Sequence, residues 1–235
     1  MCAKQKGIFK VQGSLDDVTF YKKGDSFLVR GKGGIDKERI ANDPNFRRTR
    51  ENGSEFKMMA EASKLMRNAN AVMIKKAYEG GLHQRLMKLF SDVKSADVDS
   101  VRGDRQVYRG IATSTGRLVL KGFDFNSKSP LSSLLTAPYS LDSQTGFVTI
   151  TGLIPEDMLR YPAVATHVSF QAAVLDVNFE TGEHAITYSE VVNTRINNTV
   201  QDIVAKPNGI PVGDGTKIYV LLVEFTQELN GFSML

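Results

Sequence analysis

The sequence of 235 residues predicts an α+β protein: an N-terminal antiparallel β-meander, a helical hairpin and a C-terminal immunoglobulin-like antiparallel β-sandwich. Apolar residues alternate with polar ones near both ends of the chain, as in strands. They recur every three or four residues in the middle, as in helices. Residues 1–110 carry 23 Lys and Arg against 14 Asp and Glu, whereas residues 111–235 carry 7 against 12. We therefore expect a basic strand-plus-helical-hairpin module over 1–110 and an acidic β-sandwich domain over 111–235.

Short strand-forming runs separated by turn residues predict the N-terminal meander. The predicted strands cover residues 8–11, 18–21 and 27–30, and the turns fall at 14–17 and 22–25. A glycine-rich stretch at 31–34 then ends the regular structure. It lacks the spacing of a phosphate-binding loop, so we interpret it as a flexible exit from the hairpin.

The predicted helical region has an identifiable first residue and two stripes of apolar residues. Asp43 is the expected N-cap and Pro44 the first helical residue. The first apolar stripe consists of Phe56, Met59, Ala62, Met66, Ala69, Met73 and Ala77, and the second of Leu82, Leu86, Leu89, Phe90 and Val93. Gly80 and Gly81 separate the two stripes. Two helices joined by so short a link are expected to lie antiparallel.

The second half of the chain has strand composition. Strands are predicted over 117–125, 147–151, 163–179, 184–192 and 217–225, with a hairpin turn at 180–183. Because no long helix is interleaved with these strands, the pattern favours an antiparallel sandwich.

The chain shows no recognisable catalytic or metal-binding pattern. Cys2 is the single cysteine, so it cannot form an internal disulfide. The three histidines lack metal-ligand spacing, and no GxSxG elbow is present. We therefore expect no catalytic residues, no metal, no cofactor and no small-molecule substrate.

The densest basic cluster marks the candidate binding site. It consists of Arg47, Arg48 and Arg50, to which we add Phe46, Lys22 and Lys23 as candidate partner-binding residues. One alternative is that the cluster neutralises phosphates of a nucleic acid, in a cytoplasmic protein. Another is that the arginines pair with Glu51 and Glu55 on a solvated helix.

Residues 3–60 resemble an uncharacterised bacterial family of about 200–235 residues. The resemblance rests on the segments at 4–10, 17–22, 33–35 and, above all, 43–56. The family is abundant in bacteria that use the type nine secretion system. The resemblance implies a plug or accessory protein that occludes the periplasmic end of a large outer-membrane translocon. It supplies no catalytic residues.

Two expectations on location follow. The resemblance implies a periplasmic, translocon-associated protein. In contrast, the N-terminus has no recognisable signal peptide, and no apolar run approaches the ~20 residues of a membrane helix, which by themselves predict a cytoplasmic protein.

Overall fold

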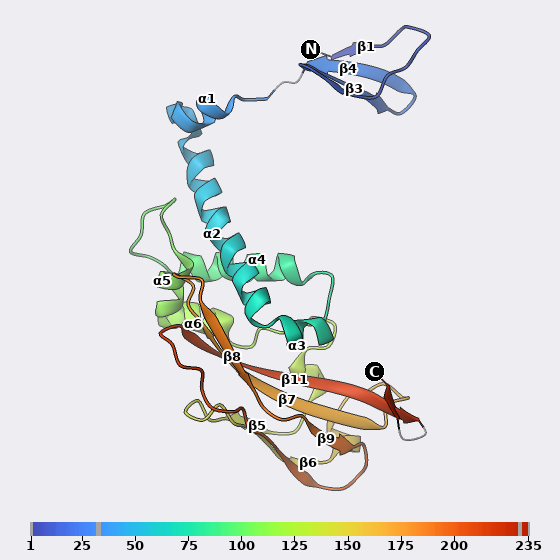
Figure 1. The fold of residues 1–235 in the computed structure, drawn as a ribbon, viewed down its shortest axis with the longest axis vertical. Helices are drawn as coiled ribbons and strands as arrows, with labels where there is room; N and C mark the ends of the chain where they lie inside the picture. The colour runs from blue at the N-terminus through green and yellow to red at the C-terminus, as the bar shows by residue number, and fades with distance from the viewer. Residues whose placement is uncertain (1, 32–33, 230–231, 235) are drawn as a thin grey trace. The chain divides into compact units, whose positions relative to one another are not determined.

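The computed structural model describes residues 2–31, 34–229 and 232–234 (Figure 1). It is a mixed α+β structure with antiparallel sheets, which confirms the predicted class. The chain forms two compact units, Met1–Asn52 (unit 1) and Gly53–Leu235 (unit 2). This division lies away from the predicted boundary between residues 110 and 111.

Unit 1 begins with a four-stranded antiparallel sheet. Its strands are β1 (Cys2–Lys4), β2 (Gly13–Leu15), β3 (Val18–Lys23) and β4 (Ser26–Gly31), in the order β1-β4-β3-β2. The strands predicted at 18–21 and 27–30 are therefore present as β3 and β4. Asp16, with φ of 43°, and Gly24, with φ of 59°, form the tight turns. Both residue types tolerate this left-handed backbone conformation.

The strand predicted over residues 8–11 is wrong, because this segment belongs to the loop between β1 and β2. The Gln5 side chain takes the place of a neighbouring strand. Its Nε2 donates to the Val11 carbonyl at 3.1 Å, and its Oε1 accepts from the Val11 amide at 3.0 Å. A side chain thus satisfies the backbone groups that a strand would have paired, and the segment leaves the sheet.

The two faces of this sheet differ in chemistry. Residues paired across strands lie on the same face, and side chains alternate along each strand. The apolar face consists of Leu15, Val18, Phe20, Phe27 and Val29, joined by Lys22, and the more polar face carries Ser14, Thr19, Tyr21, Lys23 and Arg30 together with Leu28. None of residues 3–31 is buried, so the apolar face has no covered core.

Short helices follow the sheet. Lys32 and Gly33 of the glycine-rich stretch lie outside the described residues. Helix α1 spans Lys37–Asn42, the 3₁₀ helix η1 spans Pro44–Phe46, and α2 spans Arg47–Ala69. The predicted helix start is confirmed, since Asp43 is the N-cap of η1 and Pro44 its first residue.

In unit 2, the first apolar stripe is shared by α2 and α3 (Ala71–Lys76), which meet at Asn70. The stripe is buried as expected at Ala62, Met66, Ala69 and Met73. In contrast, Phe56 is 59% exposed. All five residues of the second stripe are buried on α4 (Leu82–Ser95). Figure 1 shows α4 crossing α2 rather than running beside it, so these two helices do not form the expected antiparallel pair.

The strand predicted over 117–125 is wrong, because α6 (Ser114–Leu120), which follows α5 (Val107–Ala112), covers the first part of this segment, and residues 121–125 form no strand. The Thr113 hydroxyl caps α6 by accepting from the Gly116 amide at 3.0 Å. A Cβ atom at Gly116 would lie only 1.9 Å from the Gly110 carbonyl oxygen. Close packing between helices therefore decides the structure here, against the β-branched and aromatic composition.

Two antiparallel sheets complete unit 2, with the short helices α7 (Leu131–Leu134) and α8 (Pro155–Met158) in the connections. The three-stranded sheet has the order β10-β6-β5, and the larger sheet has the order β12-β11-β7-β8, with β9 also paired to β7. Their strands are β5 (Tyr139–Leu141), β6 (Val148–Leu153), β7 (His167–Val177), β8 (His184–Tyr188), β9 (Val192–Arg195), β10 (Gln201–Ala205), β11 (Thr216–Leu229) and β12 (Phe232–Met234). The predicted hairpin at 180–183 is present between β7 and β8.

Strand β7 lies at the centre of unit 2 and is buried on both faces. Val168 and Phe170 pack against Ile150 and Leu153 of the three-stranded sheet. Leu175 and Val177, on the opposite face, pack against Met73 of α3. The predicted antiparallel sheets are thus present, and helices cover the outer face of the larger sheet (Figure 1).

Candidate functional site

The predicted basic cluster lies at the start of α2, where Asp43 organises the chain. The Asp43 carboxylate accepts from the Asn45 amide at 2.9 Å and from the Arg39 Nε at 3.2 Å. The Asn45 N–H, followed by the Arg39 guanidinium, lowers the pKa of Asp43 below its usual value. Asp43 is therefore a helix cap that also carries an ion pair with the preceding turn.

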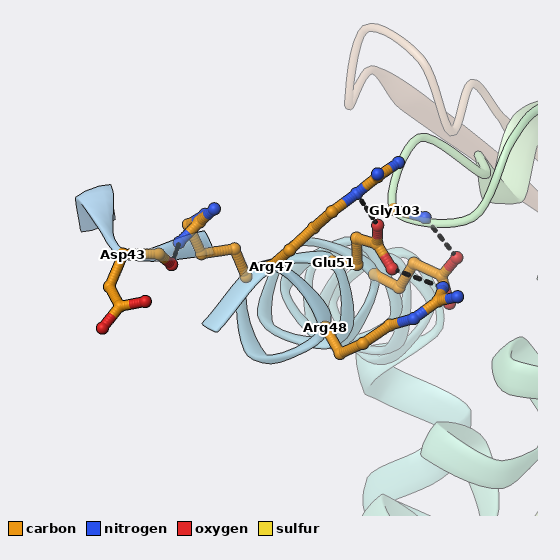
Figure 2. A network of polar contacts seen from close by, with 7 residues as sticks. Asp43, Arg47, Arg48, Glu51 and Gly103 are labelled. Atoms are coloured by element: carbon orange, nitrogen blue, oxygen red, sulfur yellow. Dashed lines mark hydrogen bonds and ion pairs between the residues drawn. The ribbon is translucent and has the colours of Figure 1, made fainter. Parts of the chain in front are cut away.

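Arg47 and Arg48 share one carboxylate on the next turn of α2, as Figure 2 shows. Arg47 Nε lies 2.9 Å from one oxygen of Glu51, and Arg48 NH1 lies 2.8 Å from the other. Burial raises the pKa of Glu51, but the Arg48 and Arg47 contacts outweigh it and hold the pKa below its usual value. The arginine side chains remain 79% and 69% exposed, so the trio is a surface patch with a net positive charge.

Arg50 has a different role from Arg47 and Arg48. Its NH1 group donates to the Ile40 carbonyl at 2.6 Å and to the Asp43 carbonyl at 3.0 Å. These carbonyls belong to α1 and to the residue before η1, so Arg50 fastens α1 and η1 to the first turn of α2. Of the three arginines, Arg47 and Arg48 are the ones that present their guanidinium groups to solvent.

The remaining candidate residues lie on other elements. Phe46 ends η1, and the Arg39 guanidinium lies 5.8 Å from its ring centroid. Lys22 and Lys23 end β3 on opposite faces of the sheet, and Lys22 Nζ lies 5.6 Å from the Phe27 ring centroid. The structure brings Phe46, Arg47, Arg48 and Arg50 together in one segment, and places the two lysines on the sheet.

The expected pairing of the arginines with Glu55 does not occur. Glu55 is buried in unit 2, where its carboxylate accepts from Lys94 Nζ and, at 2.9 Å, from the amide of Gly103, which is labelled in Figure 2. Burial raises the pKa of Glu55, but the Gly103 N–H and the Lys94 ammonium together bring it below its usual value.

A second buried carboxylate supports the same loop. Asp97 accepts from the Ser100 amide at 3.2 Å and from the Gln106 amide at 2.9 Å. Glu55 and Asp97 therefore hold the loop at 97–106, and this network is structural. The sequence holds one signal for it, since Glu55 is a carboxylate spaced four and seven residues before the apolar Met59 and Ala62.

Sequence reasoning also missed the most exposed apolar residues of unit 1. Ile8 is 96% exposed and Phe9 is 88% exposed, both in the loop between β1 and β2. Successive side chains of a strand point to opposite faces of the sheet. A strand at 8–11 would therefore have placed Ile8 and Phe9 on opposite faces, so this prediction gave no reason to expect both to be exposed.

A pocket of about 240 Å³ in unit 2 is lined by residues that include Met58, Glu61, Leu65, Phe179 and Glu180. Among the described residues, no group of three or more His, Cys, Asp or Glu side chains is placed to hold a metal ion. In the same part of the chain, no helix combines the length and apolar character of a membrane span.

Comparison of the chain with protein-family models, curated proteins and solved structures finds no match.

Proposed function

We propose that this protein is a non-enzymatic binding protein, a plug or accessory subunit that occludes the periplasmic end of a type nine secretion system translocon. One observation carries the proposal of binding: none of residues 3–31 and 34–52 is buried, although the sheet of unit 1 has an apolar face. A small sheet gains stability when another surface covers such a face. The resemblance of residues 3–60 to the translocon-associated family is the basis for proposing the translocon as the partner.

The charge of unit 1 indicates the chemistry of that partner. Arg47 and Arg48 present exposed guanidinium groups on α2, and at the end of β3 Lys22 lies on the apolar face of the sheet and Lys23 on the opposite face. A partner that binds unit 1 is expected to combine apolar side chains with carboxylates, because complementary charge speeds association and selects the partner. Phe46 and Phe20 would supply aromatic contacts, which are common in the centres of interfaces.

The proposal is tested by co-purification. The chromosomal copy is tagged, and a large outer-membrane translocon subunit is sought after detergent extraction. The double variant Arg47→Glu/Arg48→Glu is expected to recover at least about tenfold less of that subunit. The matched control Lys64→Glu/Lys75→Glu, which reverses two exposed charges in unit 2, is expected to recover as much as the unmodified protein. Circular dichroism of both variants checks that their helices are intact.

Two outcomes would contradict the proposal. One is a strictly cytosolic protein on fractionation, because such a protein cannot occlude a periplasmic opening. The other is recovery of nucleic acid without any membrane protein, with binding that weakens steeply as salt rises. The second outcome would support the cytoplasmic nucleic-acid alternative.

A further inference from the structure

The loop between β1 and β2 presents two neighbouring apolar side chains to solvent. Ile8 is 96% exposed and Phe9 is 88% exposed. Single exposed apolar residues are ordinary on a protein surface. An adjacent aliphatic and aromatic pair with almost all of its surface in water is different, because both side chains gain from entering the same apolar environment.

The loop is held in this shape by hydrogen bonds. The Gln5 side chain binds both backbone groups of Val11, and the Gln5 amide donates to the Phe27 carbonyl at 2.9 Å. Lys10 Nζ donates to the Gln5 carbonyl at 2.8 Å and to the Gly7 carbonyl at 2.7 Å. These contacts close the base of the loop and leave Ile8 and Phe9 at its tip. Binding through the tip therefore needs little ordering of the chain.

Lysines gather at the same end of the sheet. β1 ends at Lys4, which pairs with Leu28 near the start of β4, and β3 ends at Lys23, which pairs with Ser26. The β1–β2 loop and the β3–β4 turn therefore lie at one end of the sheet (Figure 1). The lysines of this end are Lys4, Lys6, Lys10, Lys22 and Lys23, and Asp25 is the single carboxylate among residues 4–12 and 22–25.

We propose that this tip, residues 4–12 with Lys22 and Lys23, inserts into an anionic lipid surface. Ile8 and Phe9 enter the boundary between head groups and acyl chains. The ammonium groups of the surrounding lysines contact lipid phosphates, except that of Lys10, which holds the loop. The combination of exposed apolar residues with surrounding lysines is what binds peripheral proteins to anionic membranes. A projecting tip suits a deformable surface, which needs no matching pocket. The inference does not depend on the translocon and goes beyond the proposed function.

The test uses the absence of tryptophan from the chain. Phe9→Trp in the full chain places the sole indole at the tip, and its emission is followed during titration with vesicles. With vesicles of phosphatidylcholine containing about 30% phosphatidylglycerol, we expect a blue shift that weakens as salt rises. We expect at least about tenfold weaker binding to pure phosphatidylcholine. The control Val212→Trp, at a residue of unit 2 that is 98% exposed, is expected to show no shift.

Paired variants test whether vesicle binding is specific to the tip or arises from any exposed apolar residues. Ile8→Ser/Phe9→Ser is expected to lower vesicle co-sedimentation at least about tenfold, because the buried apolar area is lost. The matched control Val98→Ser/Val101→Ser removes residues that are 81% and 70% exposed in a loop of unit 2, and is expected to bind as the unmodified protein does. All four positions are exposed, so folding is unaffected.

The proposal is overturned if Phe9→Trp shows no shift with either vesicle, or if both serine pairs lose binding equally. It is also overturned if the indole shifts only on addition of an acidic protein, which would assign the tip to a protein pocket. Failure of these measurements leaves the translocon co-purification untouched, so the two proposals can fail separately.

Discussion

Unit 1 and unit 2 hold their shapes by different means. In unit 2, β7 is buried on both faces, and Phe90 and Phe170 are fully buried within apolar clusters. In unit 1, none of residues 3–31 and 34–52 is buried, and three of its aromatic rings, Tyr21, Phe27 and Phe46, lie under cations instead. Unit 2 is therefore stabilised by apolar burial, whereas unit 1 depends on hydrogen bonds, caps and cation–π contacts, each of modest worth.

This difference explains where binding is expected. A unit with a complete core gains little from a partner, but a unit whose apolar face is only partly covered gains stability when a partner binds. The same reasoning makes unit 1 the more easily opened part of the chain.

The largest expected effect contrasts one phenylalanine in each unit. Phe90 is fully buried on α4, and its ring centroid lies 5.4 Å from that of Phe179. Phe90→Ala is expected to lower the free energy of unfolding by about 3–5 kcal/mol. Phe20→Ala in unit 1 is expected to lower it by less than about 1 kcal/mol. Urea unfolding followed by circular dichroism measures both. Equal losses would contradict the comparison, because they would show that unit 1 holds a packed core.

The next effect concerns the buried carboxylate of unit 2 and its pH dependence. Glu55→Gln is expected to cost about 3 kcal/mol at neutral pH, because Lys94 is left buried without its partner charge. Since the folded-state pKa of Glu55 lies below its usual value, its stabilisation is present above about pH 4.3 and is lost as pH falls through the folded-state pKa.

The stability difference between the unmodified protein and Glu55→Gln is therefore expected to shrink as the pH falls below about 4.3, the ordinary value for a Glu carboxyl. Urea unfolding of both proteins across this range measures it, and Asp92→Asn on the surface of α4 is the control with no such difference. A difference that stays constant with pH would show that the Glu55 charge is not responsible.

The smallest expected effect is on the local stability of α1 and η1 in unit 1. Arg50→Lys keeps the charge but loses the guanidinium geometry that reaches two carbonyls, so α1 and η1 are expected to loosen. Hydrogen exchange of the amides over 37–46 is expected to accelerate by roughly fivefold, with no change in unit 2. Arg48→Lys, at an exposed position one residue from Arg47, serves as the control. Equal acceleration by both variants would show that Arg50 has no special part in this connection.

Patterns that depend on neighbouring residues were predictable. Asp43 caps the turn that begins at Pro44, because the cap bonds to an amide two residues away. The stripe over 82–93 is buried, since its spacing keeps one face of a helix apolar. The hairpin at 180–183 forms where the Asn178 side chain accepts from the amides of Glu180 and Thr181.

Three features were missed because particular side-chain and packing contacts control them. The segment at 117–125 has strand composition, but the close approach of Gly116 to Gly110 places α6 there. The Gln5 side chain removes residues 8–11 from the sheet. Glu55 binds Lys94, which lies 39 residues further along the chain. Sequence periodicity carries no record of such contacts, because it reports only which residues share a local face.

The sequence by itself determined the α+β class, the helix starts and the strands with strong alternation, since these depend on bonds between residues close in the chain. The tertiary structure alone decided which polar groups became buried supports and which stayed at the surface. It separated Arg50 from Arg47 and Arg48, and it placed Ile8 and Phe9 at the tip of a loop. The physical reason is that exposure depends on what the rest of the chain covers, and coverage is set by packing between distant segments.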